Sequence, residues 1–174
     1  TAVDGLIQPG TVQSLCGQLA AGWIDHAVQD ALSGRLQAIV TAPVCKAALH
    51  AADIPYPGHT EMLVALTGAR DADMFFWSPR LSVGLATIHV PLARVPALLD
   101  VHRIATVTRR VCAALRTRAC PRPRIGVLGL NPHAGENGLF GDAESTVIAP
   151  AIEAVRAEGI DADGQLVPDT AFRP

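Results

Sequence analysis

Short apolar runs without polar alternation occur along this 174-residue chain, and longer stretches with helical periodicity lie between them. The runs at residues 38–41 and 124–130 are typical of strands that are buried on both faces of a sheet. Apolar side chains at helical spacing predict helices over residues 15–33 and 147–155. Strands that alternate with helices indicate an α/β fold built around a mostly parallel sheet.

Turn and cap residues add detail to this pattern. Gly34 ends the first helix, Thr60 is expected to cap a helix over 61–68, and Pro150 predicts a kink or an early break in the last helix. We expect residues 160–174 to be irregular, without a helix or strand. The remaining elements are helices at 44–52 and 104–115 and a hairpin of strands at 74–77 and 81–87.

The composition excludes several classes of protein. The charge of −2, from 14 basic and 16 acidic residues, leaves no basic patch for nucleic acid. No apolar stretch reaches the 18 residues that a membrane span requires, and residues 1–10 lack the basic start of a signal peptide. Four scattered cysteines without a CxxC pair favour free thiols and a cytoplasmic protein.

Two histidines follow predicted strands. Ligands of open α/β sheets bind beyond the carboxyl ends of the strands, which selects the loops at 41–46, 87–91 and 130–136. His89 and His133 occupy the second and third of these loops, and together they can bind one metal ion. The alternative is two neutral histidines, each hydrogen-bonded to a loop carbonyl.

A second group of polar residues precedes the predicted helix at 61–68. His59 and Thr60 adjoin a helix N-terminus, which favours an anion; the alternative is a simple cap by Thr60 with His59 exposed. Lys46 follows a predicted strand and can reach a phosphate or carboxylate, or it is a solvated helix lysine. Glycines at 135, 138 and 141 do not match a dinucleotide fingerprint, so we expect them to provide loop flexibility.

Five segments together resemble a known family. In chain order they are residues 41–46 (TAPVCK), 57–61 (PGHTE), 86–92 (ATIHVPL), 129–136 (GLNPHAGE) and 168–172 (PDTAF). Their order and spacing are similar to those of 4-hydroxythreonine-4-phosphate dehydrogenases, which act in pyridoxal 5′-phosphate (vitamin B6) biosynthesis. The resemblance extends from about Gly10 to the end of the chain.

The resemblance implies a fold, a reaction and an assembly. The fold is a three-layer α/β/α arrangement like that of isocitrate and isopropylmalate dehydrogenases. The reaction is NAD- or NADP-dependent, metal-assisted oxidation of 4-phosphohydroxy-L-threonine at C3, followed by decarboxylation to 3-amino-2-oxopropyl phosphate. The implied assembly is a cytoplasmic homodimer with a zinc, magnesium or cobalt ion at a site that the two subunits share.

The resemblance also assigns residues by position. His59 and Thr60 match a substrate-binding pair, and His89 and His133 match two of three histidine ligands to the metal. Asp169 matches an acidic residue near the metal, and Lys46 matches a lysine without a defined role; both are possible catalytic residues. Cys45 departs from the pattern, since asparagine or histidine is more usual there.

Family members are about twice as long as this chain. We therefore expect residues 1–174 to be one α/β segment, truncated at both ends, from the middle of a longer two-subdomain enzyme. The third metal-binding histidine would then lie outside the segment, and the segment alone would be inactive.

The sequence is also compatible with other functions. A related dehydrogenase acting on threonate or erythronate 4-phosphate, or on a carboxylated cis-dihydrodiol, is the nearest alternative. A metal-dependent hydrolase or lyase with Glu136 as the base is a second. A domain that only dimerises is a third.

Overall fold

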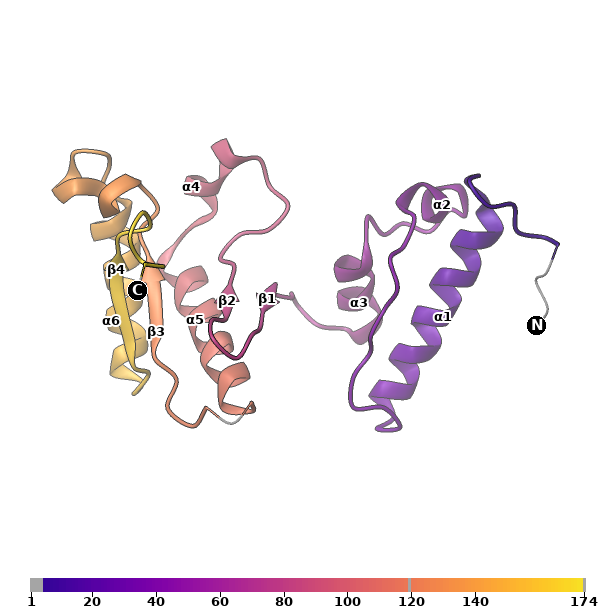
Figure 1. Ribbon diagram of the computed structural model, residues 1–174, viewed down its shortest axis with the longest axis horizontal. Helices are drawn as coiled ribbons and strands as arrows, with labels where there is room; N and C mark the ends of the chain where they lie inside the picture. Colours follow the sequence, from indigo (N-terminus) through magenta and orange to yellow (C-terminus); the bar gives the residue numbers. More distant parts are fainter. Residues whose placement is uncertain (1–4, 119, 174) are drawn as a thin grey trace. The chain divides into compact units, whose positions relative to one another are not determined.

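The computed structural model describes residues 5–118 and 120–173, which belong to two compact units (Figure 1). Unit 1 comprises residues 1–72 and unit 2 comprises residues 73–174. Each unit has its own hydrophobic core. That both belong to a single α/β segment of a larger enzyme stays a prediction.

Unit 1 is a group of helices. Helix α1 (Ser14–Leu32) packs on α2 (Lys46–Ala51) and α3 (His59–Thr67). The apolar face of α1 was predicted from the sequence. Gly34, with a φ of 79°, follows the cap residue Ser33 and ends the helix as expected. The buried core residues of the unit are Ala21, Ile24, Val28, Leu49 and Met62.

Two predictions in unit 1 are wrong. Residues 38–41 form no strand, and the side chain of Val40 is 97% exposed. An apolar run becomes a buried strand only where another strand supplies the ladder of hydrogen bonds, and no described strand pairs with this run. Thr60 does not cap α3 either, because the helix begins one residue before it and the extended Gly58 occupies the cap position.

Unit 2 starts with a hairpin. Strand β1 (Phe75–Phe76) pairs antiparallel with β2 (Val83–Gly84), which confirms the predicted hairpin in a shorter form. The hydroxyl of Ser78 in the turn accepts from the Leu81 amide at 3.1 Å and donates to the Leu81 carbonyl at 2.7 Å. The 3₁₀ turn η1 (Leu92–Arg94) and the short helix α4 (Val95–Leu98) follow.

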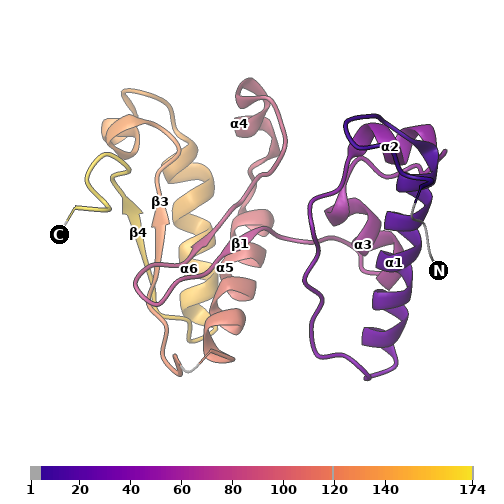
Figure 2. The ribbon, with the colours of Figure 1, turned by 45° about the vertical axis from the view of Figure 1, so that its right-hand side comes forward.

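The rest of unit 2 forms a strand–helix–strand unit. Helix α5 (Val101–Arg116) leads to strand β3 (Ile125–Leu128), and helix α6 (Ala149–Ala157) then connects β3 to the parallel strand β4 (Ala162–Leu166). In both views α5 and α6 cover the same face of this sheet (Figure 2). The helices at 104–115 and 147–155 and the strand at 124–130 are therefore confirmed, with shifted ends.

The prediction that residues 160–174 are irregular is wrong for β4. Its sequence, Ala-Asp-Gly-Gln-Leu, has little strand propensity, so the pairing with β3 decides its conformation. Gln165 is an extra residue in the ladder, because Val127 pairs with Gly164 and Leu128 with Leu166.

Pro150 is the second residue of α6 and follows η3 (Glu144–Ile148), a wider π-helical turn. The helical backbone continues from η3 into α6, so the early break predicted at Pro150 does not occur, and the irregularity there is the π-helical turn.

The two helices and the sheet pack around an apolar core. Buried side chains from α5, β3, η3, α6 and β4 meet there, among them Cys112, Ile148, Ile152 and Val155. The α/β class is confirmed for this unit. All four cysteines are free, as expected. None of the helices in the described parts of the chain is both long and apolar enough to cross a membrane.

Candidate functional site

The segment after β3 has an unusual backbone. Five successive residues, His133–Asn137, have positive φ angles between 43° and 81°, within the turn η2 (Pro132–Gly138). Left-handed helical conformation costs about 1–2 kcal/mol for each residue with a side chain. Such strain persists only where the surrounding structure holds it, and it is concentrated at functional sites.

The imidazole of His133 lies between two carboxylates. Its Nδ1 is 2.9 Å from Oε2 of Glu136, and its Nε2 is 3.9 Å from Oδ2 of Asp169. An ionised carboxylate only accepts hydrogen bonds, so Nδ1 is the donor in the contact with Glu136. Histidines that bind metals are commonly oriented in this way by a carboxylate on the other nitrogen.

The topology explains why these groups meet. His133 follows β3 and Asp169 follows β4, and these strands are parallel neighbours. Their carboxyl ends therefore lie at one edge of the sheet, where ligands of α/β proteins bind. All three side chains are half exposed or more, with exposed fractions between 50% and 60%.

A buried carboxylate packs against the turn η2. The side chain of Glu144, only 4% exposed, accepts hydrogen bonds from the backbone amides of Leu130 and Asn131 and from the side-chain amide of Asn131. Burial raises the pKa of Glu144, but the hydrogen bonds from Asn131 and Leu130 lower it more, so the pKa lies below its ordinary value.

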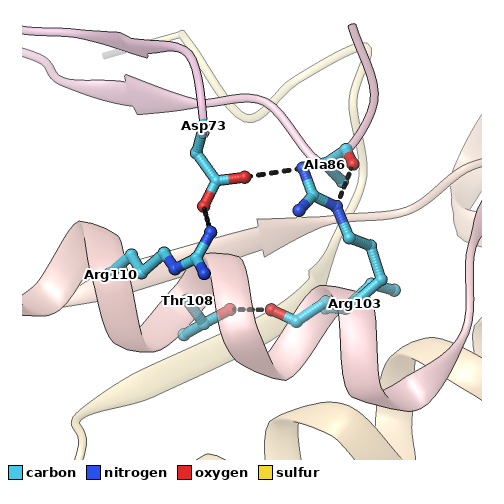
Figure 3. Close-up of polar contacts among 6 residues, drawn as sticks. Asp73, Ala86, Arg103, Thr108 and Arg110 are labelled. Atoms are coloured by element: carbon cyan, nitrogen blue, oxygen red, sulfur yellow. Dashed lines mark hydrogen bonds and ion pairs between the residues drawn. The ribbon is translucent and has the colours of Figure 1, made fainter. Parts of the chain in front are cut away.

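His89 lies in the segment after β2. It also has a positive φ, 54°, and its side chain is exposed. A polar network ties the start of this segment to α5: Nε of Arg103 donates to the carbonyl of Ala86 at 2.7 Å (Figure 3). Asp73 pairs with Arg103 and with Arg110, both at 2.6 Å. The turn that carries His89 is thus anchored to a long helix.

Helix α4, which follows this turn, lies at the same end of unit 2 as the segment after β3 in both ribbon views (Figures 1 and 2). Across residues 5–118 and 120–173 there is no group of three or more His, Cys, Asp or Glu side chains arranged to hold a metal ion. The sharing of one ion by His89 and His133 therefore stays a prediction.

The residues predicted to bind substrate lie in unit 1. A Cβ placed on the buried Gly58 would be 3.4 Å from Oε2 of Glu61 and 3.8 Å from Cε of Lys46, so both side chains pass beside this glycine. His59 and Thr60 are the first two residues of α3. Nε2 of His59 is buried and has no hydrogen-bond partner among the described residues.

The sequence patterns thus identified the segments but not all of their residues. Lys46 lies beside the segment of His59 and Thr60, and Asp169 lies beside His133. The supporting Glu144 was missed, since a glutamate in a helical pattern normally faces solvent. Gly135 was expected to give flexibility, but it is buried against Glu144: a Cβ there would be 2.7 Å from Oε2.

Comparison with known proteins supports the resemblance. The chain is 43% identical over 166 residues to a D-threonate 4-phosphate dehydrogenase of Pectobacterium atrosepticum, covering 95% of this chain and 51% of that protein. It is 43% identical over 171 residues to a 4-hydroxythreonine-4-phosphate dehydrogenase of Bradyrhizobium diazoefficiens, covering 95% and 49%. The chain spans about half the length of these curated relatives.

A solved structure agrees with the sequence matches. The crystal structure of a 4-hydroxythreonine-4-phosphate dehydrogenase from Klebsiella pneumoniae superposes with a TM-score of 0.91 at 45% identity, covering 98% of this chain and 52% of that one. The family model described as pyridoxal phosphate biosynthetic protein PdxA matches residues 1–174. The chain therefore belongs to the PdxA family.

Proposed function

We propose that the full-length protein is an NAD(P)-dependent dehydrogenase that oxidises 4-phosphohydroxy-L-threonine at its C3 hydroxyl. The resulting β-keto acid loses CO2 to give 3-amino-2-oxopropyl phosphate, a step of pyridoxal 5′-phosphate biosynthesis. Membership of the PdxA family and the similarity to 4-hydroxythreonine-4-phosphate dehydrogenases support this reaction. The observation that carries it for this chain is the oriented imidazole of His133 at the ends of two parallel strands.

The donors fit a divalent metal ion. Nε2 of His133 faces the carboxylate of Asp169, and nitrogen with oxygen is a ligand set that zinc or cobalt accepts. In our proposal His133 and His89 hold the ion, with Asp169 near it. A metal ion at this site supplies positive charge that acidifies a bound hydroxyl group.

The residues of this chain orient the reactants. Glu136 fixes the His133 ring through Nδ1, so that Nε2 remains available on the side of Asp169. In our proposal Asp169, whose carboxylate is 3.9 Å from Nε2 of His133, is the group that accepts a proton from the substrate hydroxyl. A nicotinamide cofactor supplies the hydride acceptor when it is bound.

Unit 1 contributes the substrate-binding groups of the proposal. The N-terminus of α3, the ammonium group of Lys46 and the unpartnered Nε2 of His59 all favour an anion or a polar ligand group. We assign His59 and Thr60 to hold polar groups of the phosphorylated substrate, and Lys46 to neutralise its charge. Correct placement of C3 against the cofactor depends on these contacts.

The proposal includes the wider arrangement that the resemblance implies. It comprises a three-layer fold like that of isocitrate dehydrogenase, a cytoplasmic homodimer with a shared metal site, and a third histidine ligand beyond residues 1–174. The chain spans about half of its relatives, which supports the view that it is part of a longer enzyme.

D-threonate 4-phosphate is the second candidate substrate. The relative from Pectobacterium atrosepticum carries that name at the same 43% identity as the Bradyrhizobium diazoefficiens protein. Both substrates are phosphorylated, so the groups of unit 1 serve either one.

A substrate panel tests the proposal. Full-length protein is incubated with Mg²⁺, Zn²⁺ or Co²⁺, with NAD or NADP, and with each candidate substrate, and reduced cofactor is followed at 340 nm. We expect turnover of 4-phosphohydroxy-L-threonine, and a loss of kcat by at least about 100-fold in His133→Ala, because a metal ligand is lost.

The control is His26→Ala, since His26 is exposed on α1 and its Nδ1 is 2.8 Å from the carbonyl oxygen of Gly22 in the same helix. Turnover of D-threonate 4-phosphate alone would move the assignment to the second substrate. The proposal is wrong if neither substrate reduces the cofactor, or if His133→Ala keeps the parent kcat with saturating metal.

A further inference from the structure

Glu144 is a buried carboxylate that accepts hydrogen bonds from the segment leading to His133. Its Oε1 accepts from the backbone amides of Leu130 and Asn131 at 2.9 and 2.7 Å, and its Oε2 accepts from Nδ2 of Asn131 at 3.1 Å. Bonds to an ionised carboxylate are stronger than those between neutral groups. They fix the chain direction two residues before His133.

The carboxylate of Glu144 also packs closely against the left-handed turn at His133–Asn137. A Cβ on Gly135 would be 2.7 Å from Oε2 of Glu144, and a Cβ on Gly129 would be 3.4 Å from Oε1. Gly129 also approaches the turn itself, since its Cβ would be 2.8 Å from Cα of Ala134. Two glycines therefore let the backbone close around the carboxylate, one on either side of His133 in the chain.

Glu144 is itself held by two other elements. Its carbonyl accepts from the amide of Ala149 at the end of the π-helical turn η3. The same carbonyl accepts from the side chain of Gln165, the extra residue in β4. Because Asp169 follows β4, Glu144 links the strand that positions Asp169 to the turn that positions His133.

We propose that Glu144 is a positioning residue, which fixes the left-handed turn so that the imidazole of His133 points at the metal site. This inference rests on the proposed function, because it assigns His133 as a metal ligand. Among the described residues, Glu144 forms no hydrogen bond with the imidazole of His133. Its effect passes through Asn131 and Gly135.

The test compares two substitutions of Glu144 in the full-length protein. Glu144→Leu removes every acceptor at similar volume, whereas Glu144→Gln keeps one oxygen for the amides of Leu130 and Asn131. Glu153→Gln is the control, since Glu153 is an exposed glutamate on α6, the same helical region. His133→Ala serves as the reference for loss of the ligand.

Two readouts separate positioning from simple stability, and both are recorded well below the unfolding temperature of each variant. The first is the affinity for Co²⁺, from its absorption spectrum. The second is the set of ring ¹⁵N resonances of His133 in metal-free protein, which report its tautomer and hydrogen bonds. We expect a loss of Co²⁺ affinity by at least about tenfold in Glu144→Leu, a smaller loss in Glu144→Gln, changed His133 resonances in both, and parent values in Glu153→Gln.

Folded Glu144 variants with the parent Co²⁺ affinity and the parent His133 resonances would overturn the inference. If Glu144→Leu does not fold, Glu144→Gln decides alone by the same two criteria. Parent Co²⁺ affinity in His133→Ala would instead refute the proposed metal ligand, and the ring resonances would still decide whether Glu144 sets the turn.

Discussion

His89 and His133 share a backbone conformation that residues with side chains rarely adopt. Both have a φ near 54°, and four further non-glycine residues with positive φ include Ala134, Glu136 and Asn137 of the same turn. No periodicity in the sequence encodes this, because a left-handed residue is fixed by its surroundings. The sequence therefore identified both histidines as candidates, but not the strained turn that presents His133.

Acid should remove the contribution of Glu144 to stability. Its folded pKa lies below the ordinary value, so the carboxylate stabilises the fold above the ordinary glutamate pKa, and the contribution disappears as the pH falls through the lower folded value. We expect Glu144→Gln to lower the free energy of unfolding by about 1–3 kcal/mol at pH 7, and the gap to the parent to shrink below about pH 4.

Urea unfolding of the full-length protein at pH 7, 4.5 and 3.5 measures this gap. Glu153→Gln, on the exposed face of α6, should show no gap at any of these values. If the difference in free energy of unfolding between the parent and Glu144→Gln stays constant or widens toward pH 3.5, the carboxylate of Glu144 does not stabilise the fold.

At the scale of elements, the sequence predicted those whose own side chains form the core. Helices α1 and α5 and the hairpin β1–β2 were found because their patterns are local. Strand β4 was missed because its pairing with β3 overrides a weak propensity. Residues 38–41 show the converse, an apolar run without a pairing strand in the described parts of the chain.

The contact between α1 and α2 predicts that two glycine-to-alanine substitutions in α1 change the free energy of unfolding in opposite directions. A Cβ on Gly17 would lie 2.0 Å from the carbonyl oxygen of Ala48, while a Cβ on Gly22 would meet no atom within 4 Å. Gly17→Ala should lower the free energy of unfolding by about 1–3 kcal/mol through overpacking. Gly22→Ala should raise it by about 0.5–1 kcal/mol, because alanine favours helix more than glycine does.

Denaturant unfolding of both variants in the full-length protein checks the pair. If Gly17→Ala is as stabilising as Gly22→Ala, the two helices do not pack as closely as described.

At the scale of the whole molecule, the chain contains two units and about half the length of its relatives. Lys46, His59 and Thr60 belong to unit 1, and His89, His133, Glu136 and Asp169 belong to unit 2. The proposed function assigns substrate binding to the first set and metal binding to the second, with further ligands from outside residues 1–174. We therefore expect that neither unit alone carries the proposed activity.

The proposed function depends on two imidazoles from separate turns that bind one metal ion. A crystal of the full-length protein grown with Co²⁺, with anomalous scattering recorded above and below the cobalt absorption edge, tests this binding. We expect one cobalt peak at about 2.0–2.2 Å from a ring nitrogen of both His89 and His133. A fully occupied cobalt site that excludes either histidine, or no cobalt near them at saturating concentration, would contradict it.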